Sequence, residues 1–137
     1  MNSTEQILNG YIEAAFWSTL DYTSIEDDSE NMEHLDARYD FPDLDAETRE
    51  QMARDCHEFA EEMSDAIETF VDAYGRDYDY VGHDLWLTRE RHGAGFWDRG
   101  NSYEPGGNEA RDALDSYAKN LGEFGDDLNN GLIEYQP

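Results

Sequence analysis

Apolar residues at helical spacing are most regular between Ala46 and Tyr74, and they predict one long amphipathic helix there. Asp45 precedes the pattern as an N-cap, and Gly75 follows it as a stop signal. A continuous helix of this length extends over roughly 43 Å at 1.5 Å per residue. Because this heptad-like stripe can form either a monomer core or a dimer seam, a homo-oligomer is one expectation. The stripe consists of Met52, Cys56, Phe59, Met63, Ile67, Phe70 and Tyr74.

Weaker patterns of the same period predict three more helices, at about 3–21, 77–89 and 108–124. Ser3 and Gln6 have the spacing of a capping box at the start of the first of these helices. The segments between the predicted helices are short or rich in glycine, with one exception after the first helix. Most of the chain is therefore expected to be helical.

The exception is a long acidic connection at 22–43, where Pro42 disfavours a helix. It is expected to fold back on the domain through Leu35, Tyr39 and Phe41. Near the C-terminus, Asn130-Gly131 lies between short apolar runs, which is typical of a type I′ turn in a β-hairpin. The prediction is a single, mainly α domain over residues 1–137, with about four helices and a short C-terminal β-hairpin.

The composition combines high charge with many aromatic side chains. The formal net charge is −25 over 137 residues, from 34 acidic and nine basic residues, and Lys119 is the single lysine. Aromatic residues make up 13% of the chain, enough to form a core, so we expect a folded protein despite its charge. Two explanations of the acidity remain open: adaptation to high salt, where repulsion is screened, and mimicry of a polyanion.

The single cysteine, Cys56, excludes an intramolecular disulfide, which favours a reducing compartment. It lies on the apolar face of the predicted helix and is interpreted as a buried thiol rather than a nucleophile. No run approaches the ~20 apolar residues of a membrane span, and the N-terminus does not resemble a signal peptide. The expected location is the cytoplasm.

The outer face of the long predicted helix carries acids spaced three or four residues apart. This spacing resembles a stretch of phosphate backbone, so the face is a candidate surface for a basic, nucleic-acid-binding partner protein, with no direct binding of nucleic acid. The simpler alternative is a solvated helix face. The candidate partner-binding residues are Glu47, Glu50, Asp55, Glu58, Glu61, Glu62, Asp65, Glu68 and Asp72.

The segment 83–100 has no net charge and interrupts the acidic background. It could bind an anion through glycine backbone and arginine, ligate a metal, or hold a base and its orienting carboxylate. The alternative is a structural role, in which aromatic residues fill the core and Arg–Asp pairs satisfy buried groups. The candidate residues of this segment are His83, Asp84, Arg89, Arg91, His92, Gly93, Gly95, Trp97, Asp98 and Arg99. His34 and His57 are expected to be ordinary surface residues.

The string from Gly82 to Gly100, GHDLWLTRERHGAGFWDRG, resembles the signature of a family of short proteins encoded by tailed phages and related viruses. The segments YIEAAFWS at 11–18 and QMARDCHEF at 51–59 are similar to that family's first and middle helices. The resemblance implies a viral accessory protein made in the cytoplasm of the host cell. It implies no activity, so no residue acquires a role from it.

Three functional hypotheses follow. The leading one is a non-enzymatic viral binding protein, a DNA mimic that inhibits a host nucleic-acid-binding or defence protein. The second is a viral protein of a salt-loving host, whose acidity serves solvation and whose 83–100 segment is the interaction or ligand site. The third is a small metal protein or enzyme built on His83, Asp84, His92 and Asp98. For the leading hypothesis we expect neither a catalytic residue nor a cofactor.

Overall fold

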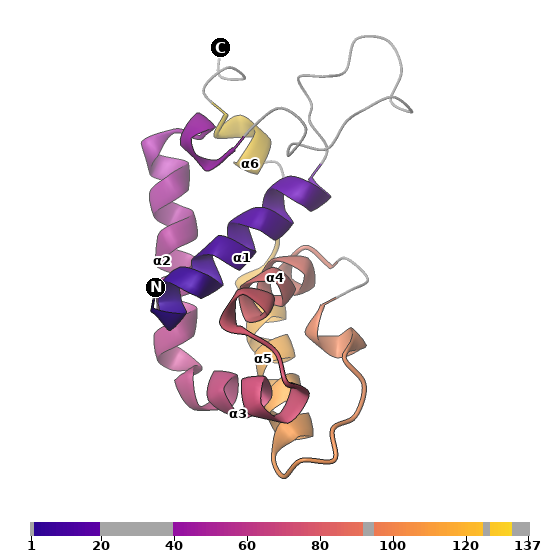
Figure 1. Ribbon diagram of the computed structural model, residues 1–137. Helices are drawn as coiled ribbons and strands as arrows, with labels where there is room; N and C mark the ends of the chain where they lie inside the picture. Colours follow the sequence, from indigo (N-terminus) through magenta and orange to yellow (C-terminus); the bar gives the residue numbers. More distant parts are fainter. Residues whose placement is uncertain (1, 20–39, 92–94, 125–126, 133–137) are drawn as a thin grey trace.

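The computed structural model describes residues 2–19, 40–91, 95–124 and 127–132. Within these ranges the chain forms five α-helices of 11 to 17 residues, a single-turn helix and two 3-10 helices (Figure 1). The mainly helical prediction is therefore confirmed. In chain order the elements are α1 (Ser3–Ser18), η4 (Phe41–Asp43), α2 (Ala46–Glu62), α3 (Ser64–Tyr74), α4 (Tyr78–Arg89), η5 (Phe96–Asp98), α5 (Gly107–Leu121) and α6 (Asp127–Asn130).

The closest helix pair is α1 and α4, and two glycines bring their backbones together. A Cβ at Gly10 would lie 1.8 Å from the carbonyl oxygen of Asp79, and a Cβ at Gly82 would lie 1.8 Å from that of Ile7. Because any larger residue would collide with the backbone of the facing helix, glycine sets the distance of this crossing. In Figure 1, α1 runs diagonally upward from its N-terminal end beside α2, and α4 lies below it.

The core is rich in aromatic side chains. Tyr11 of α1 meets Trp86 of α4 edge to face, with ring centroids 5.2 Å apart. Phe96 of η5 lies 5.4 Å from Phe70 and 6.4 Å from Phe59, so it joins α2 and α3. All five of these rings are buried. Aromatic residues therefore supply much of the core in a chain with few aliphatic ones.

The single long helix predicted over 46–74 is wrong, because the chain bends at Met63 (Figure 1). Met63 leaves helical geometry, with φ −109° and ψ 20°, and ends α2 before α3 begins at Ser64. The bend allows Ile67 and Phe70 of α3 to be buried against the rest of the core. Tertiary packing thus overrides a periodicity that continues across the bend. Apart from the partly buried Met63, the apolar stripe of α2 and α3 is buried within the chain itself from Met52 to Phe70.

The predicted C-terminal hairpin is also wrong within the described residues. Instead, α6 occupies 127–130, and the Gly131 amide donates to the Asp127 carbonyl as in a helical turn. Leu132 then forms one isolated antiparallel bridge with Leu44. Gly131 is needed because the chain passes close to α2 here: a Cβ at this position would lie 2.3 Å from the hydroxyl oxygen of Thr48.

The signals for helix ends are confirmed in two places and wrong in others. Asp45 caps α2 by accepting from the Thr48 amide at 2.8 Å, and Gly75 ends α3 in the left-handed region at φ 62°. The cap of α1 is Asn2, which accepts from the Glu5 amide, instead of the predicted Ser3 and Gln6 pair. The helices at the two ends stop at Ser18 and Leu121, about three residues earlier than predicted.

Of the acidic connection, the structure describes residues 40–43. They form η4, in which Asp40 and Asp43 cap each other's backbone. Phe41 packs against the core as predicted, whereas Leu35 and Tyr39 lie outside the described residues, as does His34. No described helix has both the length and the apolar character needed to cross a membrane.

Candidate functional site

The charged residues of the 83–100 segment that α4 and η5 position are mostly used inside the protein. Asp84 has no exposed surface and pairs with Arg99 through two hydrogen bonds, of 2.8 Å from Nε and 2.5 Å from Nη2. Burial raises the pKa of Asp84, and the hydrogen bonds from Arg99 only partly oppose this effect. The pair therefore fixes η5 against α4 and leaves no free oxygen of Asp84 at the surface.

Arg89 has a second internal role, at the end of α4. Its Nη1 donates to the Tyr11 hydroxyl at 2.7 Å and to the Asp55 carboxylate at 2.9 Å. Its Nε donates to the Gly122 carbonyl at 2.9 Å. The other oxygen of Asp55 accepts from Gln51 at 2.7 Å. One buried guanidinium thus joins α1, α2, α4 and the end of α5.

Three titratable groups around this network have shifted pKa values. Burial raises the pKa of the Tyr11 hydroxyl, although Arg89 beside it has the opposite effect. Burial also raises the pKa of the Cys56 thiol, and the nearby Asp55 carboxylate adds to that shift. Burial acts to lower the pKa of Arg89, but its contacts with Tyr11 and Asp55 outweigh it, and the net shift is upward. Cys56 is therefore a buried neutral thiol, as expected from the sequence.

The remaining backbone contacts of the segment also connect elements. The Thr88 hydroxyl accepts from the Phe96 amide at 2.9 Å. Only glycine fits at position 95, because a Cβ there would lie 2.1 Å from that hydroxyl oxygen. The Glu90 carboxylate accepts from the Phe124 amide at 2.6 Å. These contacts support the structural interpretation of the segment, in which its polar residues hold neighbouring elements in place.

The other predicted residues of this segment do not gather at one point. Arg91, at φ 60°, and Asp98 are exposed, whereas His83 is half-buried, with Nδ1 buried and without a hydrogen-bond partner. His92, Gly93 and the side chain of Trp97 lie outside the described part of the structure. Among the residues that are described, no group of three or more His, Cys, Asp or Glu side chains is arranged to hold a metal ion.

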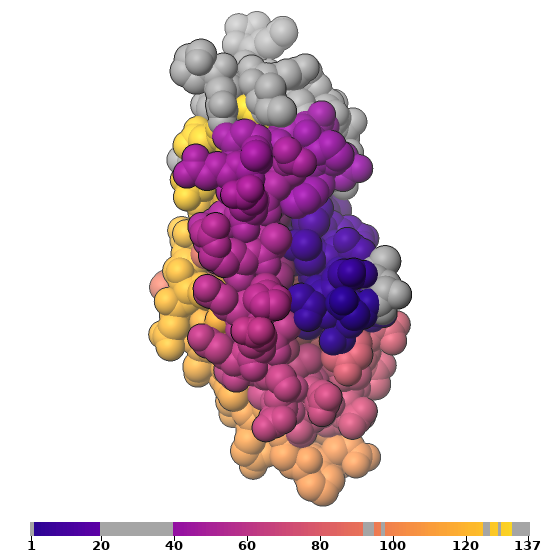
Figure 2. Space-filling view, turned by 90° about the vertical axis from the view of Figure 1, so that its left-hand side faces the viewer, coloured from indigo at the N-terminus to yellow at the C-terminus, as the bar shows by residue number. Residues whose placement is uncertain are grey.

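The predicted acidic surface is present on α2 and α3, with one exception. Asp55 is buried, because it faces inward to Arg89, and it does not belong to the surface. The other eight carboxylates are exposed and are called the acidic face below. Figure 2 shows α2 (purple to magenta) along the middle of this side, between α1 (indigo) and the C-terminal helices (yellow). The acidic face consists of Glu47, Glu50, Glu58, Glu61, Glu62, Asp65, Glu68 and Asp72.

Two contacts define the edges of the acidic face. His57, an exposed residue as predicted, lies 3.1 Å from Glu61 one helical turn away. On the side of α5, partial burial together with the charges of Glu62 and Glu58 raises the pKa of Tyr117 to about 12. The carboxylates of α2 therefore extend toward α5, and their negative potential acts on a side chain of that helix.

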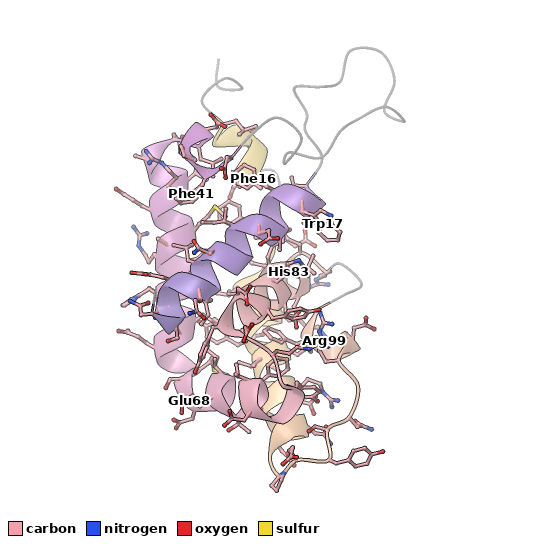
Figure 3. The ribbon with its side chains drawn as sticks, in the orientation of Figure 1. Phe16, Trp17, Phe41, Glu68, His83 and Arg99 are labelled. Carbon is pink, nitrogen blue, oxygen red and sulfur yellow. The ribbon has the colours of Figure 1, made fainter. Side chains whose placement is uncertain are left out.

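Sequence reasoning missed an exposed group of aromatic side chains on α1 and α4. Trp17 is 53% exposed, and its ring centroid lies 5.9 Å from that of His83. The ring centroid of Tyr80 also lies near His83, at 6.1 Å. Figure 3 shows His83 and Arg99 below Trp17 on the same side of the molecule, with Glu68 on the other side. No local signal marks Trp17, because its neighbours Ala14, Ala15 and Phe16 on α1 are all buried.

Comparison with known proteins adds no relative to this description. No family model matches the chain, and neither a curated protein nor a solved structure matches it. The resemblance to short phage proteins therefore stays a prediction that rests on the quoted motif.

Proposed function

We propose that this is a non-enzymatic binding protein whose acidic face occupies the basic, nucleic-acid-binding surface of another protein. The observation that carries the proposal is the exposure of eight carboxylates along α2 and α3. With the resemblance to phage accessory proteins, the expected partner is a nucleic-acid-binding or defence protein of the infected cell. Inhibition would then follow from simple occupancy of the groove.

The geometry of the acidic face supports such a role. At 1.5 Å per residue, the 17 residues of α2 and the 11 of α3 extend over about 26 Å and about 16 Å. The bend at Met63 divides the carboxylates between these two helices. Acids one turn apart are about 5 Å from each other along the axis, less dense than duplex phosphates, and the exposed Arg54 interrupts them near the start of α2.

The buried Asp55 strengthens the argument. Where a carboxylate of this segment has a structural use, it faces inward and is paired with Arg89 at 2.9 Å. The exposed carboxylates are not needed for such a pair, and their mutual repulsion destabilises the folded chain. A basic partner would remove that repulsion on binding. Long-range attraction would also speed the encounter, and the complex should weaken steeply with added salt.

The test is competition between the protein and duplex DNA for the same partner. Proteins that bind immobilised duplex DNA are eluted from a lysate and passed over the immobilised chain at low salt. We expect at least one of them to be retained and then displaced by duplex DNA. The variant E61Q/E62Q/D65N/E68Q should lose retention, whereas a matched control, E5Q/E104Q/E109Q/E123Q, removes four exposed charges elsewhere and should keep it. Equal loss in both variants would contradict the proposal.

High-salt adaptation is separated from this function by stability. If the carboxylates serve only solvation in brine, the chain needs molar salt to fold, and its unfolding midpoint at 0.1 M salt is near or below room temperature. A binding protein of an ordinary cytoplasm unfolds well above that temperature at 0.1 M. Thermal unfolding between 0.1 M and 3 M salt distinguishes the two.

A further inference from the structure

The starting observation is the aromatic row, defined as Trp17, His83 and Tyr80. Its three rings lie next to one another at centroid distances of 5.9 and 6.1 Å, from two different helices. Trp17 is 53% and Tyr80 36% exposed. Single exposed apolar residues need no explanation, but neighbouring exposed rings form a patch, and Trp and Tyr are enriched among residues that dominate binding.

The fold fixes the relative positions of the two helices that carry the aromatic row. The indole of Trp86, one turn from His83 on α4, donates to the hydroxyl of Ser18, which follows Trp17 in the chain, at 2.9 Å. The glycine crossing at Gly10 and Gly82 fixes the distance between the two helices. Because the helices that carry the rings are fixed relative to each other, no helix rearrangement opposes ligand binding.

The charges beside the row favour a cation as that ligand. Glu13 is exposed one turn before Trp17 on the same side of α1. It lines a groove of about 430 Å³ between α1 and the start of α4, together with Asp77 and Asp79. Asp79 precedes Tyr80 directly, so carboxylates accompany the row on both helices.

The row already receives guanidinium groups from its own chain. The guanidinium carbons of Arg76 and Arg99 lie 4.6 and 5.0 Å from the centroid of the Tyr80 ring. Arg99 is neutralised by its pair with Asp84, which leaves Arg76 against Glu13, Asp77 and Asp79 on this surface. The local balance is therefore negative, and stacked arginine is the chemistry that the structure itself displays.

We propose that the aromatic row is a docking site for an arginine side chain of a partner protein, with the guanidinium stacked on Trp17 and paired with Glu13. The site does not rest on the function proposed for the acidic face, because it lies on α1 and α4, on the opposite side from Glu68 (Figure 3). The aromatic row would add a specific contact, whose strength depends on ring stacking and a short ion pair. The acidic face provides long-range electrostatic attraction that does not require a matching shape.

The experiment uses the full chain and the probe acetyl-Arg-Gly-Arg-amide, followed by the NMR signal of the Trp17 indole N–H. Two matched probes replace arginine by lysine, which keeps the charge but not the plane, and by citrulline, which keeps the plane but not the charge. We expect saturable shifts that are strongest with arginine, then lysine, then citrulline. Exchanging Trp17 for leucine should weaken binding about fivefold, measured by the shift of the Tyr80 amide. E13Q should weaken it by a similar factor.

The variant E61Q/E62Q/D65N/E68Q, in which four carboxylates of the acidic face are neutralised, serves as the control. Its Trp17 indole signal should still shift with the arginine probe. If the citrulline probe binds as tightly as the arginine probe, the positive charge is not recognised. The site would then take an uncharged, apolar or hydrogen-bonding partner, and the proposal would be overturned. A shift of the Trp17 signal with protein concentration alone would indicate a second copy of the chain instead. Unchanged binding in W17L, with its fold verified by circular dichroism, would also overturn it. If the wild-type chain retains no protein that duplex DNA displaces, while the Trp17 response is intact, the acidic-face function alone is rejected.

Discussion

The segment from His83 to Gly100 and the acidic face of α2 and α3 both contain many charged side chains, and the structure uses them differently. In the neutral segment, Asp84, Arg89 and Arg99 are directed inward and pair within the chain. On the acidic face, eight carboxylates are directed outward. Charge balance in a sequence segment thus marks internal pairing here, and charge excess marks a surface.

The comparison also shows where binding should be sought. A motif that is conspicuous because it contains His, Asp, Arg and Gly suggests a ligand site, but its Asp84, Arg89 and Arg99 already have partners in the fold. Within the described residues, the acidic face and the aromatic row of α1 and α4 are exposed surfaces on which binding can be tested. The difference between the two regions can be tested through stability, because internal pairs and surface charges respond to substitution in opposite ways.

The largest expected effect is at Arg89. R89M leaves the Asp55 carboxylate buried without its cation and removes the donors to Tyr11 and Gly122, which should cost about 3–5 kcal/mol of the free energy of unfolding. The double variant R89M/D55L removes both charges and should recover a large part of that loss. Urea denaturation measures both. A loss below about 1 kcal/mol in R89M would mean that the segment is not held by this pair.

The next effect is at the crossing of α1 and α4. G82A places a methyl group 1.8 Å from the Ile7 carbonyl oxygen, so the helices must move apart at a cost of about 1–3 kcal/mol. In an isolated helix the same change stabilises by about 1 kcal/mol. The sign of the change in unfolding free energy therefore decides whether the tight crossing exists. A more stable G82A would contradict it.

Neutralising the acidic face should have a smaller effect of opposite sign. E61Q/E62Q/D65N/E68Q relieves repulsion between exposed carboxylates, so the unfolding midpoint at 20 mM salt should rise, by less than about 1 kcal/mol in free energy. The gain should vanish at 1 M salt, where charges are screened over ~3 Å. If the variant is destabilised at both salt concentrations, these carboxylates have internal partners like those of the neutral segment.

The smallest effect is a titration at the edge of the acidic face. The pKa of Tyr117 is raised to about 12, so the folded chain holds this proton more tightly than the unfolded one. The resulting stabilisation is complete below about pH 10 and is lost as the pH rises through 12. E62Q should lower the pKa of Tyr117, followed by NMR, whereas E61Q, whose carboxylate faces His57, should leave it unchanged. An equal response to both would show that only the total charge matters.

Much of the helical fold could be predicted because it is encoded locally. Four periodic patterns, the Asp45 cap and the Gly75 stop place most helix residues correctly. The bend at Met63 could not be predicted, because the apolar spacing continues through it and only Phe70 and Ile67 packing into the core requires it. The Asn130-Gly131 signal was misleading for a similar reason: Gly131 is needed where the chain passes close to Thr48.

The candidate sites were predicted less well. Eight of the nine acids are exposed as expected, since charged residues opposite an apolar stripe face solvent. Asp55 differs because its partner, Arg89, is 34 residues away in the sequence. The aromatic row was missed because its rings come from residues 17, 80 and 83, and no local pattern connects them.

By itself, the sequence determined the helical class, the aromatic core, the buried Cys56 and the acidity of one helix face, because each follows from composition or from spacing within one segment. Only the tertiary structure decided which charges are internal, where the long pattern bends, and which rings meet at the surface. Those properties depend on contacts between residues far apart in the chain, such as Arg89 with Asp55 and Trp17 with His83. The physical reason is that pairing and burial are set by the packing of whole helices, which local periodicity does not encode.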